Sequence, residues 1–360
     1  MKILFLVPYP SDGASNRYRV EQYLPYLKEN NFDYTLHPFW SREAFKALYQ
    51  KGSRLKKAYF FILSTMRRLS DVVCIFRYDI IFIHREVYTL YEIFFENVLR
   101  LSKKPVIFDF DDAIFLPSSS PQNTFIERFK SHRAVPRFIK LSSYVIAGNS
   151  FLAGYALRLN PNVALIPTSI DTQKYMPLIK KDEPDGKIVI GWVGSVTTIH
   201  FLDSLRAVFL ALSQKHSNLV FYIIGGNFSV EGLTNFRCKP WSLAQEIQDL
   251  RQIDIGIMPM PDNQWTQGKC GFKAILYMSM GIPCVCSRVG ANKEIIIEGN
   301  NGFLADTDQE WIDKLSGLIA DADLRKRIGN QARKIAEERY SVKVNAPKFL
   351  RVLNQAYQGK

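Results

Sequence analysis

Residues 177–194 read PLIKKDEPDGKIVIGWVG, and this stretch divides the chain into two parts. Residues 177–187 are polar and rich in turn formers, which predicts a linker. The apolar run 188–193, followed by Gly194, is typical of a buried parallel strand that leads into a loop. Because the chain before the linker already alternates strands and helices, the restart of this alternation predicts two successive α/β domains.

The same alternation runs outward from the linker in both directions. On the N-terminal side it predicts strands at residues 2–7, 34–37, 79–83, 105–109, 144–147 and 163–166, and helices at 20–28 and 90–101. On the C-terminal side it predicts strands at residues 188–193, 219–224, 254–258 and 283–286, and helices at 201–215, 272–280 and 311–340. This order predicts an α/β fold with two doubly wound parallel sheets. Such sheets bind ligands at the carboxyl ends of their strands, so a site is expected in the loops there.

The composition is that of a globular protein of 360 residues, 47% hydrophobic and 22% charged. The five cysteines form no C-x-x-C pair, which argues against a disulfide framework and a structural zinc site. The apolar runs are shorter than the roughly 18–20 residues of a spanning helix, and the N-terminal run lacks a signal-peptide pattern. We therefore expect a reduced, cytoplasmic protein.

The net charge of +13 is concentrated in the N-terminal half. Residues 1–180 contain 25 Lys and Arg against 15 Asp and Glu, a net charge of +10. Residues 181–360 contain 22 against 19, a net charge of +3. A basic half indicates an anionic partner. Since no recognisable nucleic-acid-binding motif accompanies the charge, we expect no nucleic-acid partner.

Two basic segments of this half combine charge with apolar residues. Residues 54–77 read RLKKAYFFILSTMRRLSDVVCIFR, and residues 128–140 read RFKSHRAVPRFIK. The first suits a segment that lies on an anionic bilayer without crossing it, which would make the protein peripheral to the membrane. A core helix with solvated basic ends explains the same residues equally well, so both interpretations stay open.

The first loop of the N-terminal domain carries small and basic residues. Gly13 lets the backbone approach a ligand, and Ser15 or Asn16 suits the N-cap of the next helix. Arg17 and Arg19 offer charge to a phosphate. A capped helix with two solvated arginines is the alternative interpretation.

Two further loops of this domain carry titratable residues. His84 follows a predicted buried strand, where it is able to orient a hydroxyl or share its proton, although a lone histidine is more often structural. The neighbouring candidates are Arg85, Glu86, Asp109, Asp111 and Asp112. The carboxylates suit a metal or a polyhydroxyl ligand, and equally suit a helix cap or an ion pair with Arg85.

The loops of the C-terminal domain combine glycines with charged residues. The candidates are Gly194, Ser195, Gly225, Asp262, Lys269, Gly271, Phe272, Lys273 and Glu294. Lys269 and Lys273 are four residues apart, so if both are helical they lie on one face of the helix. At a helix N-terminus, such a pair suits a diphosphate.

Residues 268–283, GKCGFKAILYMSMGIP, followed by SRVG at 287–290 and by Glu294, resemble the donor-binding block of family 4 (group 1) glycosyltransferases. Residues 79–84 are similar to the strand that brings a histidine to the donor sugar in that family. Gly13 and its neighbours resemble the first loop of the family's acceptor domain. The resemblance covers nearly the whole chain and implies the GT-B fold, in which two Rossmann-like domains face each other across a cleft.

The resemblance also implies what each part of the chain does. Residues 1–176 would form the acceptor-binding domain, residues 177–187 the linker and residues 188–340 the donor-binding domain, with a C-terminal helix at about 341–360 packing back on the first domain. The implied reaction moves a sugar from a nucleotide-diphosphate sugar to a glycan or lipid-linked acceptor, with retention of configuration and without a metal or other cofactor. Cell-surface polysaccharide synthesis is the implied setting.

The implied site residues fall into three groups. His84 and Asp262 would position the transferred sugar as catalytic residues, Asp262 by its position rather than by a motif. The donor-binding residues would be Gly13, Arg17, Gly194, Ser195, Gly225, Lys269, Gly271, Phe272, Lys273 and Glu294, with the two lysines and Arg17 on the diphosphate. The acceptor-binding residues would be Arg19, Arg85, Glu86, Asp111 and Asp112.

The sequence departs from the family pattern at two positions. The family's block carries two glutamates, and the corresponding positions here are Gly268 and Leu276. A leucine accepts no hydrogen bond from a ribose hydroxyl, so nucleotide recognition must use other groups. The alternative to an enzyme is therefore a non-catalytic GT-B-like protein that binds a nucleotide or glycan or acts as a scaffold. A phosphorylase or epimerase on the same architecture is a third interpretation.

Overall fold

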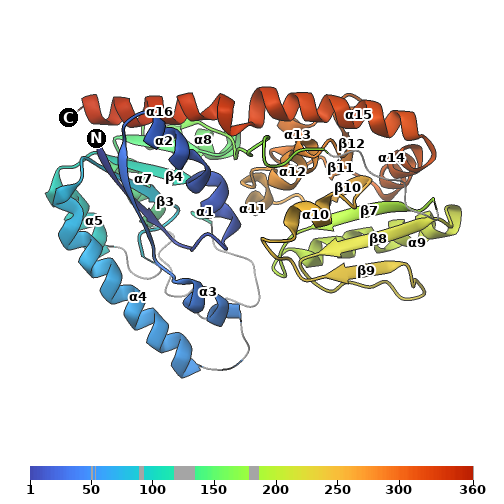
Figure 1. Ribbon diagram of the computed structural model, residues 1–360, viewed down its shortest axis with the longest axis horizontal. Coiled ribbons are helices and arrows are strands. Elements are labelled where there is room, and N and C mark those ends of the chain that lie inside the picture. Colours follow the sequence, from blue (N-terminus) through green and yellow to red (C-terminus); the bar gives the residue numbers. More distant parts are fainter. Residues whose placement is uncertain (50–51, 53, 89–92, 117–133, 178–185, 360) are drawn as a thin grey trace. The chain divides into compact units, whose positions relative to one another are not determined.

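The structure, a computed structural model, describes residues 1–359 except 50, 51, 53, 89–92, 117–133 and 178–185. The chain divides into two compact units. Unit 1 contains Met1–Ser169 and Asn345–Lys360, and unit 2 contains Ile170–Val344. In Figure 1 unit 1 runs from blue to green, with a red C-terminal helix, and unit 2 runs from green through yellow to red. The units thus change after residue 169, whereas the sequence suggested residue 176, and most of the expected linker lies outside the described residues.

Unit 1 is built on a parallel sheet with the strand order β2-β1-β3-β4-β5-β6. Its strands are β1 (Lys2–Val7), β2 (Asp33–Pro38), β3 (Ile80–His84), β4 (Val106–Phe110), β5 (Tyr144–Ala147) and β6 (Val163–Leu165). The central strands β1, β3 and β4 are almost wholly buried, as expected for apolar runs covered on both faces. Because the order reverses between β1 and β3, the carboxyl ends of these two strands form the switch point where such sheets bind ligands.

The helices of unit 1 connect these strands. They are α1 (Ala14–Arg19), α2 (Leu24–Glu29), α3 (Arg42–Tyr49), α4 (Arg54–Cys74), α5 (Ile93–Ser102), α7 (Ala134–Leu141), α8 (Ser150–Leu157) and α16 (Val342–Gln358), with 3₁₀ turns η1 (Glu21–Tyr23) and η2 (Ile75–Arg77). The C-terminal helix α16 belongs to unit 1 from Asn345 onward. Its Phe349 ring stacks on Tyr23 with centroids 4.6 Å apart and also contacts Phe82, which joins this helix to the core of unit 1.

Unit 2 has a second parallel sheet, with the order β12-β11-β10-β7-β8-β9. Its strands are β7 (Ile188–Val193), β8 (Leu219–Ile224), β9 (Phe236–Lys239), β10 (Ile255–Met258), β11 (Cys284–Ser287) and β12 (Phe303–Ala305). Its helices are α9 (Arg206–Lys215), α10 (Glu246–Leu250), α11 (Gln264–Gln267), α12 (Phe272–Ser279), α13 (Asn292–Ile295), α14 (Asp308–Ala320) and α15 (Ala322–Ile335), with turns η3 (Ile199–Leu205) and η4 (Ala336–Tyr340). Here the order reverses between β7 and β10, so the switch point lies at the ends of these strands.

The predicted strands and most predicted helices are present, but several helix boundaries differ from the predicted ones. Residues 14–19, read as a loop, form α1, so Ser15 and Asn16 lie inside a helix whose N-cap residue is Gly13. The long helix expected at 311–340 is interrupted at Asp321, whose side chain accepts a hydrogen bond from the Leu324 amide and caps α15. The short strands β9 and β12 were missed because they have too few residues for a clear alternation.

Helix α4 has one face packed on unit 1 and one face exposed. Its exposed face carries an apolar stripe, which we define as Leu55, Tyr59, Ile62, Met66, Leu69 and Val73, and every one of these is at least 42% exposed. Figure 1 shows α4 at the margin of unit 1. The packed face contains Arg68, whose guanidinium lies 3.1 Å from Asp71 and donates to the Val7 carbonyl oxygen. Arg68 is therefore a buried structural residue and not one of the solvated basic residues that the sequence suggested.

The second basic segment, 128–140, is described only from residue 134. Within it, Arg137 pairs with Glu96 at 2.6 Å, and Lys140 is exposed. Residues 128–133 lie outside the described part of the chain. None of the described helices is long and apolar enough to cross a membrane.

Candidate active site

The carboxyl ends of β3 and β4 bring His84 and Asp109 together. The two residues are register partners on neighbouring parallel strands, so their side chains leave the sheet at the same edge. His84 Nδ1 lies 2.6 Å from Asp109 Oδ2, and both side chains are fully buried. The sequence pattern placed both residues at or near strand ends, and the strand order and register bring them together.

Asp109 also forms a buried ion pair with Arg19 of α1. The guanidinium contacts both carboxylate oxygens and donates to the Ile166 carbonyl oxygen at 2.7 Å. Burial alone would raise the pKa of Asp109, but the charge of Arg19 and the contact with His84 outweigh it, so the pKa is lowered. Arg19, predicted as an acceptor-binding residue, is thus a buried partner of Asp109 and only 2% exposed.

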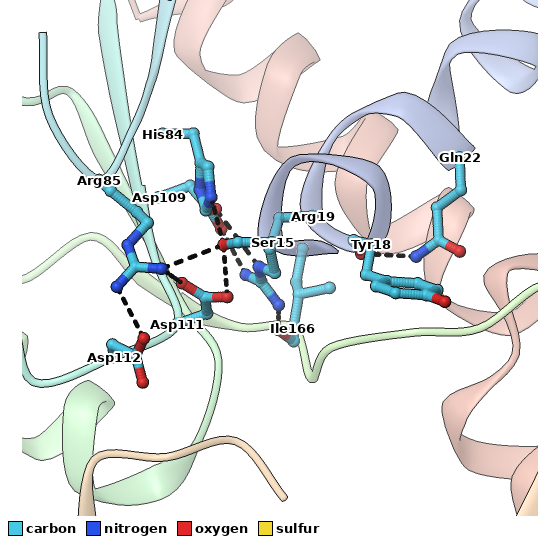
Figure 2. A network of polar contacts seen from close by, with 10 residues as sticks. All are labelled: Ser15, Tyr18, Arg19, Gln22, His84, Arg85, Asp109, Asp111, Asp112 and Ile166. Carbon is cyan, nitrogen blue, oxygen red and sulfur yellow. Dashed lines mark hydrogen bonds and ion pairs between the residues drawn. The ribbon is translucent and has the colours of Figure 1, made fainter. Parts of the chain in front are cut away.

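Ser15 extends this pair into a longer network (Figure 2). Its Oγ lies 2.7 Å from His84 Nε2 and 2.7 Å from Asp111 Oδ2. The residue is half-buried, whereas His84 is completely enclosed. The sequence pattern indicates Ser15 only as a candidate N-cap residue of a helix. Its contact with His84 joins residues 69 positions apart in the chain, so nothing local indicated it.

Arg85 links the network to Asp112. Its backbone has a φ of +66°, a left-handed conformation that costs about 1–3 kcal/mol in a residue with a side chain. The Arg85 amide donates to the Asp109 carbonyl oxygen at 2.8 Å, and its guanidinium lies 2.6 Å from Asp112 and 3.6 Å from Asp111. Desolvation opposes the charge of Arg85, but the two aspartates outweigh it and its pKa is raised. Burial would likewise raise the pKa of Asp111, yet Arg85 and the other cations lower it.

The remaining N-terminal candidates lie around this network. A Cβ added to Gly13 would lie 2.6 Å from Tyr9 Cβ. Packing against Tyr9 therefore requires a glycine at this position. The guanidinium of Arg17 lies over the Tyr18 ring, 4.8 Å from its centroid. Glu86 follows Arg85 and donates its amide to the His84 carbonyl oxygen. Within the described ranges, no group of three or more His, Cys, Asp and Glu side chains is arranged to hold a metal ion.

In unit 2 the end of β7 is defined by two glycines. Gly225, after β8, has a φ of +111°, and a Cβ on it would lie 1.8 Å from the Gly194 carbonyl oxygen. A Cβ on Gly194 would meet the Trp192 ring at 2.4 Å and Lys273 Cε at 3.1 Å. The two loops therefore approach each other at backbone distance, which only glycine permits at these positions.

Lys273 lies beside Gly194 at the start of α12. Its Nζ is 5.5 Å from the centroid of the buried Trp192 ring, a cation–π distance. Gly271, with a φ of +62°, is the N-cap residue of α12. Lys269 precedes this helix and lies 5.7 Å from the Trp265 ring centroid, so the two lysines do not share a helical face. Lys273 therefore lies at the glycine-lined strand end.

Three other predicted residues of unit 2 lie in surface loops or on a surface helix. Asp262 is exposed and accepts a hydrogen bond from Gln267 at 2.6 Å. Ser195 is exposed and contacts Thr197, and Glu294 is exposed on the short helix α13. Leu276, at the position of a family glutamate, is buried in the core of unit 2.

Two sequence comparisons with known proteins each match part of the chain. Residues 187–321, most of unit 2, match the family described as Glycosyl transferases group 1. The curated relative Spore coat protein SA of Bacillus subtilis (strain 168) is 28% identical in an alignment of 174 positions, and the match covers 43% of this chain and 45% of that protein. The chain thus matches less than half the length of this relative.

The whole chain is similar in fold to solved structures of low sequence identity. HepE of Anabaena, solved in complex with UDP and glucose, has a TM-score of 0.70 at 16% identity, over 98% of this chain and 99% of that chain. Sucrose-phosphate synthase from Thermosynechococcus elongatus has a TM-score of 0.72 at 13% identity, with both chains fully covered. The class of protein follows: this chain has the GT-B fold of glycosyltransferases. Its residues 187–321 match the group 1 family, so the expected fold is confirmed for the chain and the expected sequence resemblance is borne out over this segment.

Proposed function

We propose that the protein transfers a sugar from a nucleotide-diphosphate sugar to a hydroxyl of a glycan or lipid-linked acceptor. The observation that carries this proposal is that the family match falls on the unit whose strand ends combine glycines with Lys273. In the proposal, unit 2 binds the donor and unit 1 binds the acceptor. Retention of configuration, independence of metal and a role in cell-surface polysaccharide synthesis are parts of the same proposal.

The electrostatics of unit 2 support the donor site. The diphosphate that leaves during sugar transfer gains negative charge, and preorganised cations and helix N-termini stabilise such charge. Lys273 is the second residue of α12, and its side chain lies beside Gly194. HepE was solved with UDP and glucose, so UDP-sugars are the first donors to test.

The network of unit 1 supports an acceptor site for hydroxyl groups. Ser15, Arg85 and Asp111 are half-buried at the switch point of the sheet, with donors and acceptors that suit a glycan. His84 is enclosed and has both ring nitrogens in hydrogen bonds, so it would influence a bound sugar through Ser15 rather than by direct contact.

The competing candidate is a GT-B-like protein without turnover, favoured by the buried Leu276 where the family has a glutamate. A thermal-shift screen of nucleotides and nucleotide-diphosphate sugars tests whether a donor binds, because a ligand of the folded state raises its stability. We then expect sugar transfer or slow donor hydrolysis with the donor that binds. Binding without either reaction would favour the non-catalytic candidate, and no binding by folded protein would contradict the donor site.

Lys269→Ala tests the contribution of the second lysine. If Lys269 contacts the diphosphate, its loss should weaken nucleotide binding about tenfold, since hydrogen bonds to charged groups contribute about 1.5–3 kcal/mol. Isothermal titration calorimetry with the nucleotide found in the screen measures the change. Unchanged affinity and turnover would remove Lys269 from the proposed site.

The proposal includes association of unit 1 with an anionic membrane surface. The apolar stripe of α4 is flanked by the exposed Arg54, Lys56 and Arg67, which suits a helix that lies in the headgroup region. Sedimentation with phosphatidylglycerol and phosphatidylcholine vesicles tests it. We expect binding to the anionic vesicles that salt weakens and that a Tyr59→Ser/Ile62→Ser double variant abolishes.

A matched control for this experiment is Leu210→Ser, which changes an exposed apolar residue of unit 2. It should sediment like the unaltered protein. Equal sedimentation with both lipids, or with none, would contradict an anionic membrane surface as the partner. Size-exclusion chromatography decides whether the stripe instead joins two copies of the chain.

A further inference from the structure

Within the network of unit 1, three hydrogen bonds join four side chains in sequence, and Arg85 also donates to Ser15 Oγ at 3.4 Å (Figure 2). The chain of three hydrogen bonds begins at Asp109 Oδ2, passes through both ring nitrogens of His84 and Ser15 Oγ, and ends at Asp111 Oδ2. The three distances are 2.6, 2.7 and 2.7 Å. All three lie within the range of well-formed hydrogen bonds, so each needs a proton between its two heavy atoms.

A proton count shows that the neutral side chains do not suffice. A neutral histidine carries one ring proton and a serine carries one hydroxyl proton, whereas an ionised carboxylate carries none. The chain would then hold two protons for three hydrogen bonds. A third proton must reside either on His84, making it an imidazolium, or on one of the two aspartates.

The charged groups around the chain favour His84 as the holder of this proton. Arg19 lies against Asp109, and Arg85 lies against Asp111 and Asp112, so three carboxylates face only two permanent cations. An imidazolium at His84 balances these charges. Burial would raise the pKa values of Asp109 and Asp111, but Arg19, Arg85 and the ring of His84 together lower both, which keeps the carboxylates ionised beside His84. The other titratable groups that interact with Arg85 are Tyr9 and Glu86.

We propose that Ser15 is a positioning residue that fixes His84 as a buried imidazolium at neutral pH. Ser15 accepts the Nε2 proton of His84 and donates its own proton to Asp111, so it sets both the charge of the ring and the direction of its own hydroxyl. A histidine in this state is not a proton acceptor. On the proposed function, His84 then acts on a bound sugar as a fixed positive charge.

Nitrogen NMR of the full chain labelled with ¹⁵N-histidine tests the proposal without any substrate. At pH 8 an ordinary histidine, with a pKa near about 6.5, is neutral and its two ring nitrogens have widely different shifts. We expect the His84 signals, assigned by their loss in His84→Asn, to show two protonated nitrogens instead. A neutral His84 in the unaltered protein at pH 8 would overturn the proposal, and neutral signals from all five histidines would do so even if no variant folds.

Ser15→Ala sharpens the test. Without the serine, one proton satisfies the remaining contact with Asp109, so His84 should become the neutral tautomer with its proton on Nδ1. Ser15→Thr keeps the hydroxyl and should restore the doubly protonated ring, and the matched control Ser70→Ala, at an exposed site of α4, should leave it unchanged. An imidazolium that persists in Ser15→Ala would remove Ser15 from this role. Because the signal is read without substrate, its outcome is independent of the transfer assay.

Discussion

The two units share one design of sheet but differ at the ends of their strands. At the switch point of unit 1, charged side chains crowd together and neutralise one another, with Arg19, Asp109 and His84 fully buried. At the switch point of unit 2, glycines bring two loops to backbone distance, and Lys273 contributes the charge. The switch point of unit 1 is stabilised by ion pairs in a buried environment of low dielectric constant. The switch point of unit 2 requires glycines, because side chains would prevent its loops from approaching each other. Substitutions should therefore destabilise the two switch points for different physical reasons.

The largest effect is expected where the buried charges of unit 1 are separated. Asp109→Ala leaves Arg19 without its carboxylate in the interior, which should destabilise unit 1 by about 3–5 kcal/mol. Hydrogen exchange read by mass spectrometry should show faster exchange in unit 1 and little change in unit 2. Asp203→Ala is the matched control: it removes an ion pair with Arg206 in unit 2 whose side chains are half exposed, and should cost at most about 1 kcal/mol. Equal effects of the two substitutions would contradict the comparison.

In unit 2, the substitution expected to destabilise the switch point most is Gly225→Ala. The new methyl group would collide with the Gly194 carbonyl oxygen, and the residue would keep a positive φ, so we expect a loss of about 2–4 kcal/mol confined to unit 2. Gly232→Ala separates the two causes, because Gly232 also has a positive φ, +82°, but no atom within 4 Å of the added Cβ. Its cost should be about 1 kcal/mol. Hydrogen exchange of the two variants measures both values.

A smaller effect concerns binding rather than folding. Lys273→Met keeps a long side chain over Trp192 but removes the charge, so nucleotide affinity should fall about tenfold, or about 1.4 kcal/mol, while the stability of unit 2 changes little. Calorimetric titration of the nucleotide gives the affinity. Lys326→Met, at an exposed position of α15, should bind as the unaltered protein does. A loss of affinity in both variants would indicate a general effect of net charge.

The mildest perturbation is a change of pH. The folded-state pKa values of Asp109 and Asp111 are lower than those of free carboxyls, so their stabilising contribution is complete above the unfolded pKa of about 3.9 and is lost as the pH falls below it. Acidification from pH 5 to pH 3 should therefore weaken unit 1 more than unit 2. Thermal unfolding combined with hydrogen exchange at each pH, corrected for intrinsic rates, measures the difference, and Asp109→Asn should reduce it.

Much of the fold could be predicted because its signals are local. The apolar runs of β1, β3 and β7 and the polar stretch before Ile188 predict two sheets without reference to distant residues. The positions of His84, Asp109 and Gly194 at strand ends follow from the same runs. Helix α1 could not be predicted with equal ease, since its residues are small and polar and it is stabilised by tertiary contacts such as the Arg19–Asp109 pair.

The sequence by itself determined the number of sheets, the strand ends that carry polar residues and glycines, and the resemblance of residues 187–321 to group 1 glycosyltransferases. Only the tertiary structure decided which of these residues meet and which are buried. It enclosed Arg68 and Arg19, which the sequence assigned to solvent or a ligand, joined Ser15 to His84, and brought Lys273 to Gly194. The physical reason is that periodicity and turn chemistry are encoded within a few neighbouring residues. Ion pairs and hydrogen bonds between distant residues depend instead on strand order, register and the burial that packing creates.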